Sequence, residues 1–516
     1  MAAALLLLHL LGLFSSFPTA SGLLFEQPSG FRAAVYEHRC ERPERTLVNR
    51  TRAVSNMMKN VNVYRQQAAI ASSQGAQIIV FPEDGIYGTP FSRSRIRPYL
   101  EHIPDPATTS PPWIPCTHPD RFTPSDILSH LSCIARDNHV YVVANLGDIQ
   151  PCVSTDNSKD AKTSPCPDYG HFQYNTDVAF DPQGTLVARY HKRDLFGERQ
   201  FDTPDVEYSI FDTPFGRFGL FTCFDILFYE PAVTLVERGV TNVAFPTAWI
   251  NGHFPMHGAV QLHSAWARGL GVNLLAANYH WPEHAFVGSG IFTPEGPVGY
   301  FYNTTTGSSG HLVVADVAPV SSPRTLSAAS DYTDDLTFET PPVFEKRIEH
   351  QVYSMVEIVK GSGNASVCKG DTCCRLQYQR DAASSELFAL GVFEGIMREQ
   401  IDWYFEACLL MRCTNGSHSS CGEESEESRP NPPSPSCGDS NSRQLCKNAR
   451  VASRFVGKFS TKYVYPEVIV SDGGQLALTP RDQWDFTQGG SLQARNISKP
   501  LLAAALYARV YTRDPQ

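Results

Sequence analysis

The stretch GLFTCFDILFYEP, residues 219–231, decides how this chain is interpreted. Its apolar beginning predicts a buried strand over residues 218–222, and the change of pattern after it predicts a sharp turn into a helix. That turn carries a single thiol, Cys223. A buried strand that ends in a polar or reactive residue is typical of α/β sheets, which place their ligands at the carboxyl ends of strands.

Two other stretches end in the same way. IIVFPEDGIYG, residues 78–88, brings Glu83 to the end of a predicted strand, and FDPQGTLVARYHKRDLF, residues 180–196, does the same for Lys192. A carboxylate, an amine and a thiol at neighbouring strand ends are the groups needed to hydrolyse an amide through a thioester. The sequence therefore predicts an active site made of Glu83, Lys192 and Cys223.

Strands and helices alternate from residue 31 to about residue 316, which predicts a layered α/β domain. Residues 54–71 carry apolar side chains three and four positions apart, as in an amphipathic helix. The other predicted strands are residues 31–38, 76–84, 139–148, 215–225, 241–249 and 272–280 with a hairpin over 176–192, and the other predicted helices are residues 230–239 and 257–271.

The composition changes after residue 316. We expect a signal peptide over residues 1–22, a hydrolase domain over 23–316, a Pro- and Ser-rich linker over 317–345 and a β-rich domain over 346–516. In the last domain, residues 387–398 are the one segment interpreted as helical. The acidic, Pro- and Ser-rich stretch between Cys421 and Cys446 has the composition of a disordered loop.

Several features predict a secreted protein without a membrane span. The apolar run near the N-terminus is too short to cross a bilayer and is followed by small residues, as in a signal peptide. The C-terminus lacks the hydrophobic tail of a lipid-anchor signal. The net charge of −10 argues against a nucleic-acid partner. Candidate glycosylation sites are Asn49, Asn303, Asn364, Asn415 and Asn496.

The chain has 14 cysteines, which favours disulfides in an oxidising compartment over zinc, since CxxC spacing is absent. The sequence leaves the pairing and the oligomeric state open. If Cys223 is kept reduced for chemistry, an odd number remains, so at least one further cysteine is unpaired. Cys40 is the candidate because no other cysteine is near it in the sequence.

Each candidate residue also has an ordinary structural interpretation. A cysteine in an apolar strand is often a small buried hydrophobe, and a lone lysine is often solvated. Placed together, the three have complementary chemistry: Lys192 and the following helix would lower the pKa of Cys223 from about 8.5, and Glu83 would take and return protons.

Three histidines and one tryptophan lie near the predicted site in the sequence. His253, His257 and His263 form a loose cluster without the carboxylate neighbours of a zinc site, so no metal and no cofactor are predicted. Trp249 either lines the substrate pocket or belongs to the core, and the sequence does not separate the two.

The motifs FPEDGIYG, QYNTDVAFDPQGTLVARYHK and FTCFDILF resemble the Glu, Lys and Cys motifs of the nitrilase superfamily. Together with HSAWARGLGVNLLAAN, VCKGDTCC and LYARVY, they are similar to its vanin/biotinidase branch. The resemblance implies an αββα sandwich followed by a β-rich domain. It also implies that Glu83 is the general base and acid, that Lys192 stabilises the oxyanion and that Cys223 is the nucleophile.

The same resemblance implies a small-molecule amide substrate. Vanins split pantetheine into pantothenate and cysteamine, whereas biotinidase releases biotin from biocytin. The run over residues 263–278 is closer to the vanins, so pantetheine is the expected substrate and biocytin is the alternative. An inactive binding protein with the same fold is the remaining possibility.

Overall fold

The structure is a computed structural model. It describes residues 30–44, 46–152, 166–252, 255–324, 326, 338–348, 350–359, 361–380, 386–414, 416–422, 452–473, 475–479, 481–495 and 497–515. The predicted signal peptide, the acidic stretch over residues 423–451 with Cys437 and Cys446, and His253, Asn415 and Asn496 lie outside the described residues.

The first domain contains two six-stranded sheets. In the first, the strand order is β12 (His311–Val317), β1 (Phe31–Glu37), β2 (Ile78–Val80), β3 (Tyr141–Pro151), β4 (His171–Phe180) and β5 (Leu186–His191). In the second, the order is β11 (Gly296–Phe301), β10 (Ser289–Thr293), β9 (Asn273–Asn278), β8 (Asn242–Thr247), β7 (Gly216–Leu220) and β6 (Ser209–Thr213). The centre of each sheet is parallel: β1, β2 and β3 in one, and β7, β8 and β9 in the other.

Helices cover the outer faces, and the two sheets pack against each other through aromatic side chains. Phe31 of β1 lies 4.8 Å from Phe215 and 5.6 Å from Phe218 between ring centroids. The helices are α1 (Arg50–Ser73), α2 (Arg93–Ile96), α3 (Asp126–Asn138), α4 (Thr234–Glu237) and α5 (Ala259–Leu270). This four-layer arrangement confirms the predicted αββα sandwich, and α1 follows the predicted periodicity, with Met57, Val61, Tyr64 and Ala68 buried.

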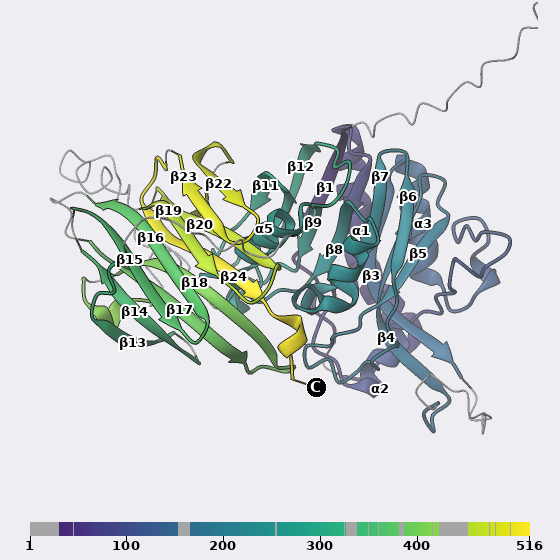
Figure 1. Cartoon of the computed structure of the whole chain (residues 1–516). Helices are drawn as coiled ribbons and strands as arrows, with labels where there is room; N and C mark the ends of the chain where they lie inside the picture. The colour runs from purple at the N-terminus through teal and green to yellow at the C-terminus, as the bar shows by residue number, and fades with distance from the viewer. Residues whose placement is uncertain are drawn as a thin grey trace, which may run out of the picture.

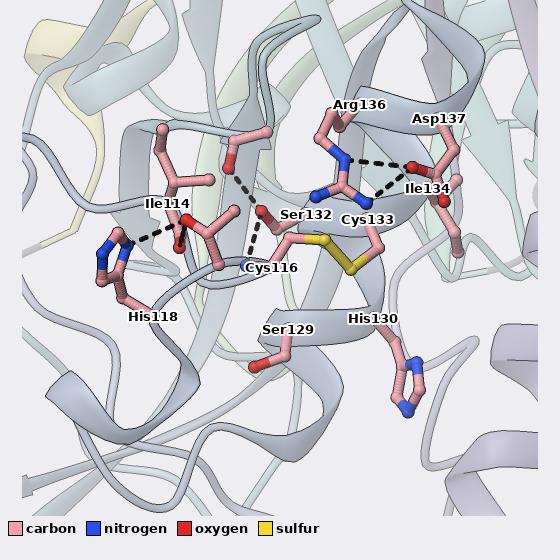
Figure 2. Close-up of a disulfide and its surroundings, with 12 residues drawn as sticks. Ile114, Cys116, His118, Ser129, His130, Ser132, Cys133, Ile134, Arg136 and Asp137 are labelled. Carbon is pink, nitrogen blue, oxygen red and sulfur yellow. Dashed lines mark hydrogen bonds and ion pairs between the residues drawn. A yellow bond between two sulfur atoms is a disulfide. The ribbon is translucent and has the colours of Figure 1, made fainter.

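One disulfide ties the loop before α3 to the helix itself. Cys116 pairs with Cys133, and next to the bond the backbone N–H of Cys116 donates to the hydroxyl of Ser132 at 3.1 Å (Figure 2). The Ser132 hydroxyl in turn donates to the carbonyl of Gly184, in the β4–β5 turn. The disulfide therefore lies where the loop, the helix and the turn of the β4–β5 hairpin meet.

The second domain is built almost entirely from strands, in a seven-stranded and a five-stranded sheet. The larger has the order β13 (Val343–Ile348), β14 (Gln351–Ile358), β17 (Leu387–Met397), β18 (Trp403–Cys413), β24 (Leu501–Arg509), β20 (Val464–Asp472) and β21 (Gln475–Leu478). The smaller has the order β15 (Gly361–Lys369), β16 (Thr372–Arg380), β19 (Ala452–Lys458), β23 (Ser491–Ala494) and β22 (Trp484–Thr487).

The prediction that residues 387–398 form a helix is wrong. Residues 387–397 form the strand β17 instead. Most of the strand is buried because it lies in the interior of the seven-stranded sheet, between β14 and β18. A strand that is buried on both faces has a nearly continuous apolar sequence, which periodicity cannot distinguish from a buried helix.

Five disulfides are formed among the described residues. They are Cys116–Cys133, Cys152–Cys166, Cys368–Cys373, Cys374–Cys408 and Cys413–Cys421. Cys40 and Cys223 are the free, buried cysteines of the part that the structure describes. The preference for disulfides and the expectation that Cys40 is unpaired are both confirmed.

The two domains lie side by side (Figure 1), with α5 of the first domain packed against β20 of the second. Gly269 of α5 is required at this contact: a Cβ there would lie 2.7 Å from the carbonyl of Val464. The linker boundaries stay a prediction. No helix among the described residues has the length and apolar character to span a bilayer.

Short helical turns complete the described chain. They are η1 (Arg97–Tyr99), η2 (Pro119–Arg121), η3 (Cys223–Leu227), η4 (Tyr229–Val233), η5 (Pro282–His284), η6 (His418–Ser420), η9 (Arg481–Gln483) and η10 (Tyr511–Arg513). Among them, η3 matters most for function because it begins at Cys223.

Candidate active site

The three predicted residues follow three different strands. Glu83 comes three residues after β2, Lys192 directly after β5, and Cys223 three residues after β7. Strands β2 and β5 belong to one sheet and β7 to the other, so the site lies where the carboxyl ends of both sheets meet.

The Glu83 carboxylate joins the two sheets. Its Oε1 accepts hydrogen bonds from Lys192 Nζ and from Asn175 Nδ2, each at 2.7 Å. Its Oε2 accepts from the backbone N–H of Ala248, just after β8, at 2.9 Å. Burial raises the pKa of the Glu83 carboxyl above its ordinary value, and Lys192 opposes that rise. A base with an elevated pKa is suited to exchange protons near neutral pH.

Lys192 is held between two carboxylates. Besides Glu83, its Nζ donates to Glu198 Oε2 at 2.8 Å, and Glu198 Oε1 accepts from Asn175 Nδ2 at 2.6 Å. Burial by itself would lower the pKa of Lys192, but Glu198 and Glu83 raise it well above its ordinary value. The amine is therefore a permanent cation that hydrogen bonds fix in place.

Cys223 begins the short helix η3 in a strained backbone conformation. Its φ is +47°, in the left-handed region that costs a non-glycine residue about 1–2 kcal/mol. Buried carboxylates hold the preceding residue: the Thr222 hydroxyl donates to Asp177 at 2.7 Å, and the Thr222 N–H donates to Asp225 at 2.9 Å. Strain that is stabilised from several sides is characteristic of residues that must present one atom in a fixed direction.

The environment of the thiol differs from the expectation. Burial raises the pKa of Cys223 well above its ordinary value, Glu83 raises it further, and Lys192 opposes both. The predicted lowering of this pKa is therefore wrong, because burial disfavours the thiolate and the charge of Glu83 adds to that effect, and together they outweigh Lys192. In the resting site the thiol keeps its proton.

A cavity of about 120 Å³ opens beside Cys223. Its first-domain wall is mainly apolar and includes Phe196, Cys223, Phe224, Leu227, Ala248, Trp249, Ile250 and His257. Its remaining wall comes from the second domain: Met397 at the end of β17, Glu399 in the following loop and Trp403 at the start of β18. The second domain therefore forms part of the site.

Trp249 is packed in the core and also forms part of the cavity wall. Only 8% of its surface is exposed, yet it lines the cavity. Its indole N–H donates to the carbonyl of His257 at 2.8 Å, and its backbone N–H donates to Asn278 Oδ1 at 2.8 Å. These bonds fix one wall of the cavity.

The histidines do not assemble a metal site among the described residues. His257 lines the cavity, whereas His263 is fully buried against Phe245 and Trp249. Burial lowers the pKa of His263 to about 3, so this ring is neutral.

Known protein families match both domains. The carbon-nitrogen hydrolase family matches residues 43–270, and the vanin C-terminal domain matches residues 343–514. Pantetheinase from Mus musculus is 40% identical over 497 residues, which cover 94% of this chain and 90% of that protein. Biotinidase from Bos taurus is 36% identical over 525 residues, which cover 95% and 93%.

This chain belongs to the vanin/biotinidase branch of the carbon–nitrogen hydrolases. It is an enzyme that hydrolyses amides. Among solved structures, an amidase from Nesterenkonia sp. matches with 23% identity and a TM-score of 0.40, covering 57% of this chain and 93% of that one.

The candidate active site contains a further carboxylate, Glu198, that the sequence pattern did not reveal. Glu198 binds Lys192 as closely as Glu83 does, from the loop after β5. A carboxylate six residues after the predicted lysine was the available signal, but nothing in that stretch distinguishes it from the acidic residues of an exposed loop. Only the packed structure shows that the side chain turns inward.

Proposed function

We propose that this hydrolase cleaves pantetheine to pantothenate and cysteamine through a thioester on Cys223. The observation that carries the mechanism is the ion pair between Lys192 and Glu83, 2.7 Å long and almost completely buried, beside a free thiol at the wall of a cavity. It supplies a base, a cation and a nucleophile in one water-poor site.

In the first step Glu83 removes the thiol proton while the Cys223 sulfur attacks the amide carbonyl carbon. The charge that develops on the carbonyl oxygen is stabilised by the ammonium of Lys192. Glu83 then returns the proton to the amide nitrogen, the carbon–nitrogen bond breaks, and cysteamine leaves as the neutral amine. The acyl group remains on the sulfur as a thioester.

In the second step a water molecule replaces the amine. Glu83 takes a proton from the water as its oxygen attacks the thioester carbonyl, and the carbon–sulfur bond breaks. The proton held by Glu83 returns to the sulfur, so that pantothenate leaves and the resting thiol is restored. One carboxylate with a raised pKa therefore serves both half-reactions.

The raised pKa of the resting thiol suits this sequence. A proton that stays on sulfur until substrate arrives is available to Glu83 at the moment of attack. The free thiol is also less open to oxidation than a thiolate in an oxidising compartment.

The cavity supports pantetheine as the substrate. Pantetheine is long, flexible and uncharged, and the lining of the cavity is mainly apolar. Biocytin would require buried partners for its ureido ring and would place the carboxylate of its lysine near the site. A pocket built for such groups rejects ligands that lack them because its own polar atoms would be left unpaired.

Biocytin remains the second candidate because biotinidases cover this chain as completely as pantetheinases do. The test is to offer each compound separately to the purified enzyme and to measure the release of cysteamine or lysine. We expect a higher kcat/KM for pantetheine. More efficient hydrolysis of biocytin would reassign the substrate, and binding without turnover of either would favour a binding protein.

We also propose that the chain is secreted and glycosylated. The disulfides and the relatives are consistent with an extracellular protein. Of the described sequons, Asn49 is exposed at the start of α1, while Asn303 and Asn364 are partly buried. Mass spectrometry of the secreted protein before and after glycosidase treatment tests which sites carry glycans, and an unmodified Asn49 would contradict the proposal at its most accessible site.

A further inference from the structure

A buried arginine of the second domain reaches the turn that carries the candidate nucleophile. Arg509 is the last residue of β24, and its side chain is fully buried. Its Nε donates a hydrogen bond to the carbonyl oxygen of Leu227 at 2.8 Å. Leu227 is the last residue of η3, the helical turn that begins at Cys223, and its side chain lines the cavity.

The guanidinium of Arg509 is fixed from every side. It forms a bidentate ion pair with Asp514, with contacts of 3.0 and 2.8 Å, and it also donates to the carbonyl of Tyr404. The Tyr511 ring stacks at 4.5 Å from the guanidinium carbon. A planar donor group held in this way has little freedom to follow a moving acceptor, so it fixes the position of the Leu227 carbonyl.

The turn needs support at both of its ends. At the Cys223 end, Asp177 and Asp225 bind Thr222, and Cys223 itself stands in a strained conformation. At the Leu227 end, a helix terminates and leaves carbonyl oxygens without partners inside the helix. Arg509 provides a charged partner for one of them and comes from a different domain.

We propose that Arg509 is a positioning residue for the reaction: through the carbonyl of Leu227 it fixes the turn that presents the Cys223 sulfur to the amide. The inference rests on the proposed function of Cys223 as nucleophile. A displacement of the reacting atom by about 1 Å can reduce the rate by about 10²-fold. The second domain would therefore determine the rate of the chemical step as well as the shape of the cavity.

The test compares three variants of the full-length enzyme. Arg509→Met removes the bond to Leu227, and Arg509→Lys keeps the charge but not the planar fork of donors. Arg513→Met is the matched control, because Arg513 pairs with Glu394 at 3.4 Å and Glu406 at 3.8 Å within the second domain. If Arg509→Met does not fold, Arg509→Met/Asp514→Asn removes both charges of the Arg509–Asp514 ion pair together.

Three measurements separate positioning from general damage. For Arg509→Met we expect kcat with pantetheine to fall about 10- to 100-fold, with KM changed less than about threefold. The rate of alkylation by iodoacetamide, assigned to Cys223 by peptide mass spectrometry, should fall in parallel. Arg509→Lys should lie between Arg509→Met and wild type, and Arg513→Met should keep its rate even where its melting temperature falls.

A folded Arg509→Met enzyme with wild-type kcat and alkylation rate would overturn the inference. So would an equal loss of kcat in Arg513→Met. The Cys223→Ala variant keeps this result distinct from failure of the proposed function: if that variant still turns over pantetheine, the thioester mechanism is wrong, whereas an inactive Cys223→Ala together with a fully active Arg509→Met refutes only the role of Arg509.

Discussion

The regions around Cys223 and Cys40 make an instructive comparison, because both hold a buried, unpaired thiol. Burial raises the pKa of both sulfur atoms. The Cys40 sulfur accepts a hydrogen bond from Asn60 at 3.2 Å, and the acidic neighbours Asp84 and Glu41 raise its pKa further.

Cys223 lines the cavity, and the cation Lys192 acts on its sulfur. Lys192 opposes the rise in the pKa of Cys223, and Glu83 is close enough to influence it. A high resting pKa therefore does not by itself identify an inert thiol. A candidate nucleophile is distinguished by a neighbouring base that can take its proton and by a cavity in which a substrate can bind.

The largest expected effect separates the two thiols directly. Cys223→Ala should reduce kcat/KM for pantetheine by about 10⁶-fold, the scale on which loss of a catalytic nucleophile acts. Cys40→Ala should keep wild-type activity because Cys40 does not line the cavity. Steady-state assays of both purified variants, with intact-mass analysis for an acyl adduct on the wild type, check this prediction. Turnover by Cys223→Ala, or a disulfide at Cys223 in the active enzyme, would refute the assignment.

The next-largest effects on the rate are expected at Lys192 and Glu83, the two charged residues that act on Cys223. Lys192→Ala should lower kcat by about 10²–10³-fold, as expected for loss of one oxyanion donor. Glu83→Gln keeps the shape of the side chain but cannot accept a proton, so both acylation and deacylation should slow. Rapid-quench measurement of the two steps checks this. If Glu83→Gln retained a nearly normal rate, another base would be in use.

A smaller effect concerns the missed carboxylate. Glu198→Gln leaves the charge of Lys192 less neutralised, so the pKa of Cys223 should fall from its raised value and the pH profile of alkylation should move to lower pH. The matched control is Glu207→Gln, which removes the same charge from a residue that binds His191, beside Lys192. An unchanged profile in Glu198→Gln, or an equal shift in the control, would contradict this account.

The smallest effect is on stability. Because burial raises the pKa of Cys223 and of Cys40, both thiols stay protonated in the folded protein at a pH where they ionise in the unfolded chain. Their contribution to the free energy of unfolding is complete below the pKa of cysteine in the unfolded chain, about 8.5. It is lost as pH rises above that value, with a slope of up to about 1.4 kcal/mol per pH unit for each thiol. Denaturant unfolding of wild type and Cys40→Ala between pH 7 and 10 checks this: the variant should lose less stability over that range.

The sequence by itself determined most of the first domain and the three residues proposed for catalysis. Alternation of apolar strands and amphipathic helices is a local pattern, so it predicted α1, β9 and the β4–β5 hairpin without knowledge of the packing. The positions of Glu83, Lys192 and Cys223 at strand ends followed in the same way. The unpaired state of Cys40 followed from its isolation in the sequence.

The tertiary structure decided what depends on burial and on distant partners. It turned Glu198 toward Lys192. It also buried the Cys223 sulfur near Glu83, which reversed the expected shift of the Cys223 pKa. It made residues 387–397 a strand because neighbouring strands bury them. It brought Trp403 of the second domain to the cavity wall, and it brought Arg509 to the carbonyl of Leu227 at the end of η3. Desolvation and long-range hydrogen bonding are properties of the packed chain, and no local sequence pattern encodes them.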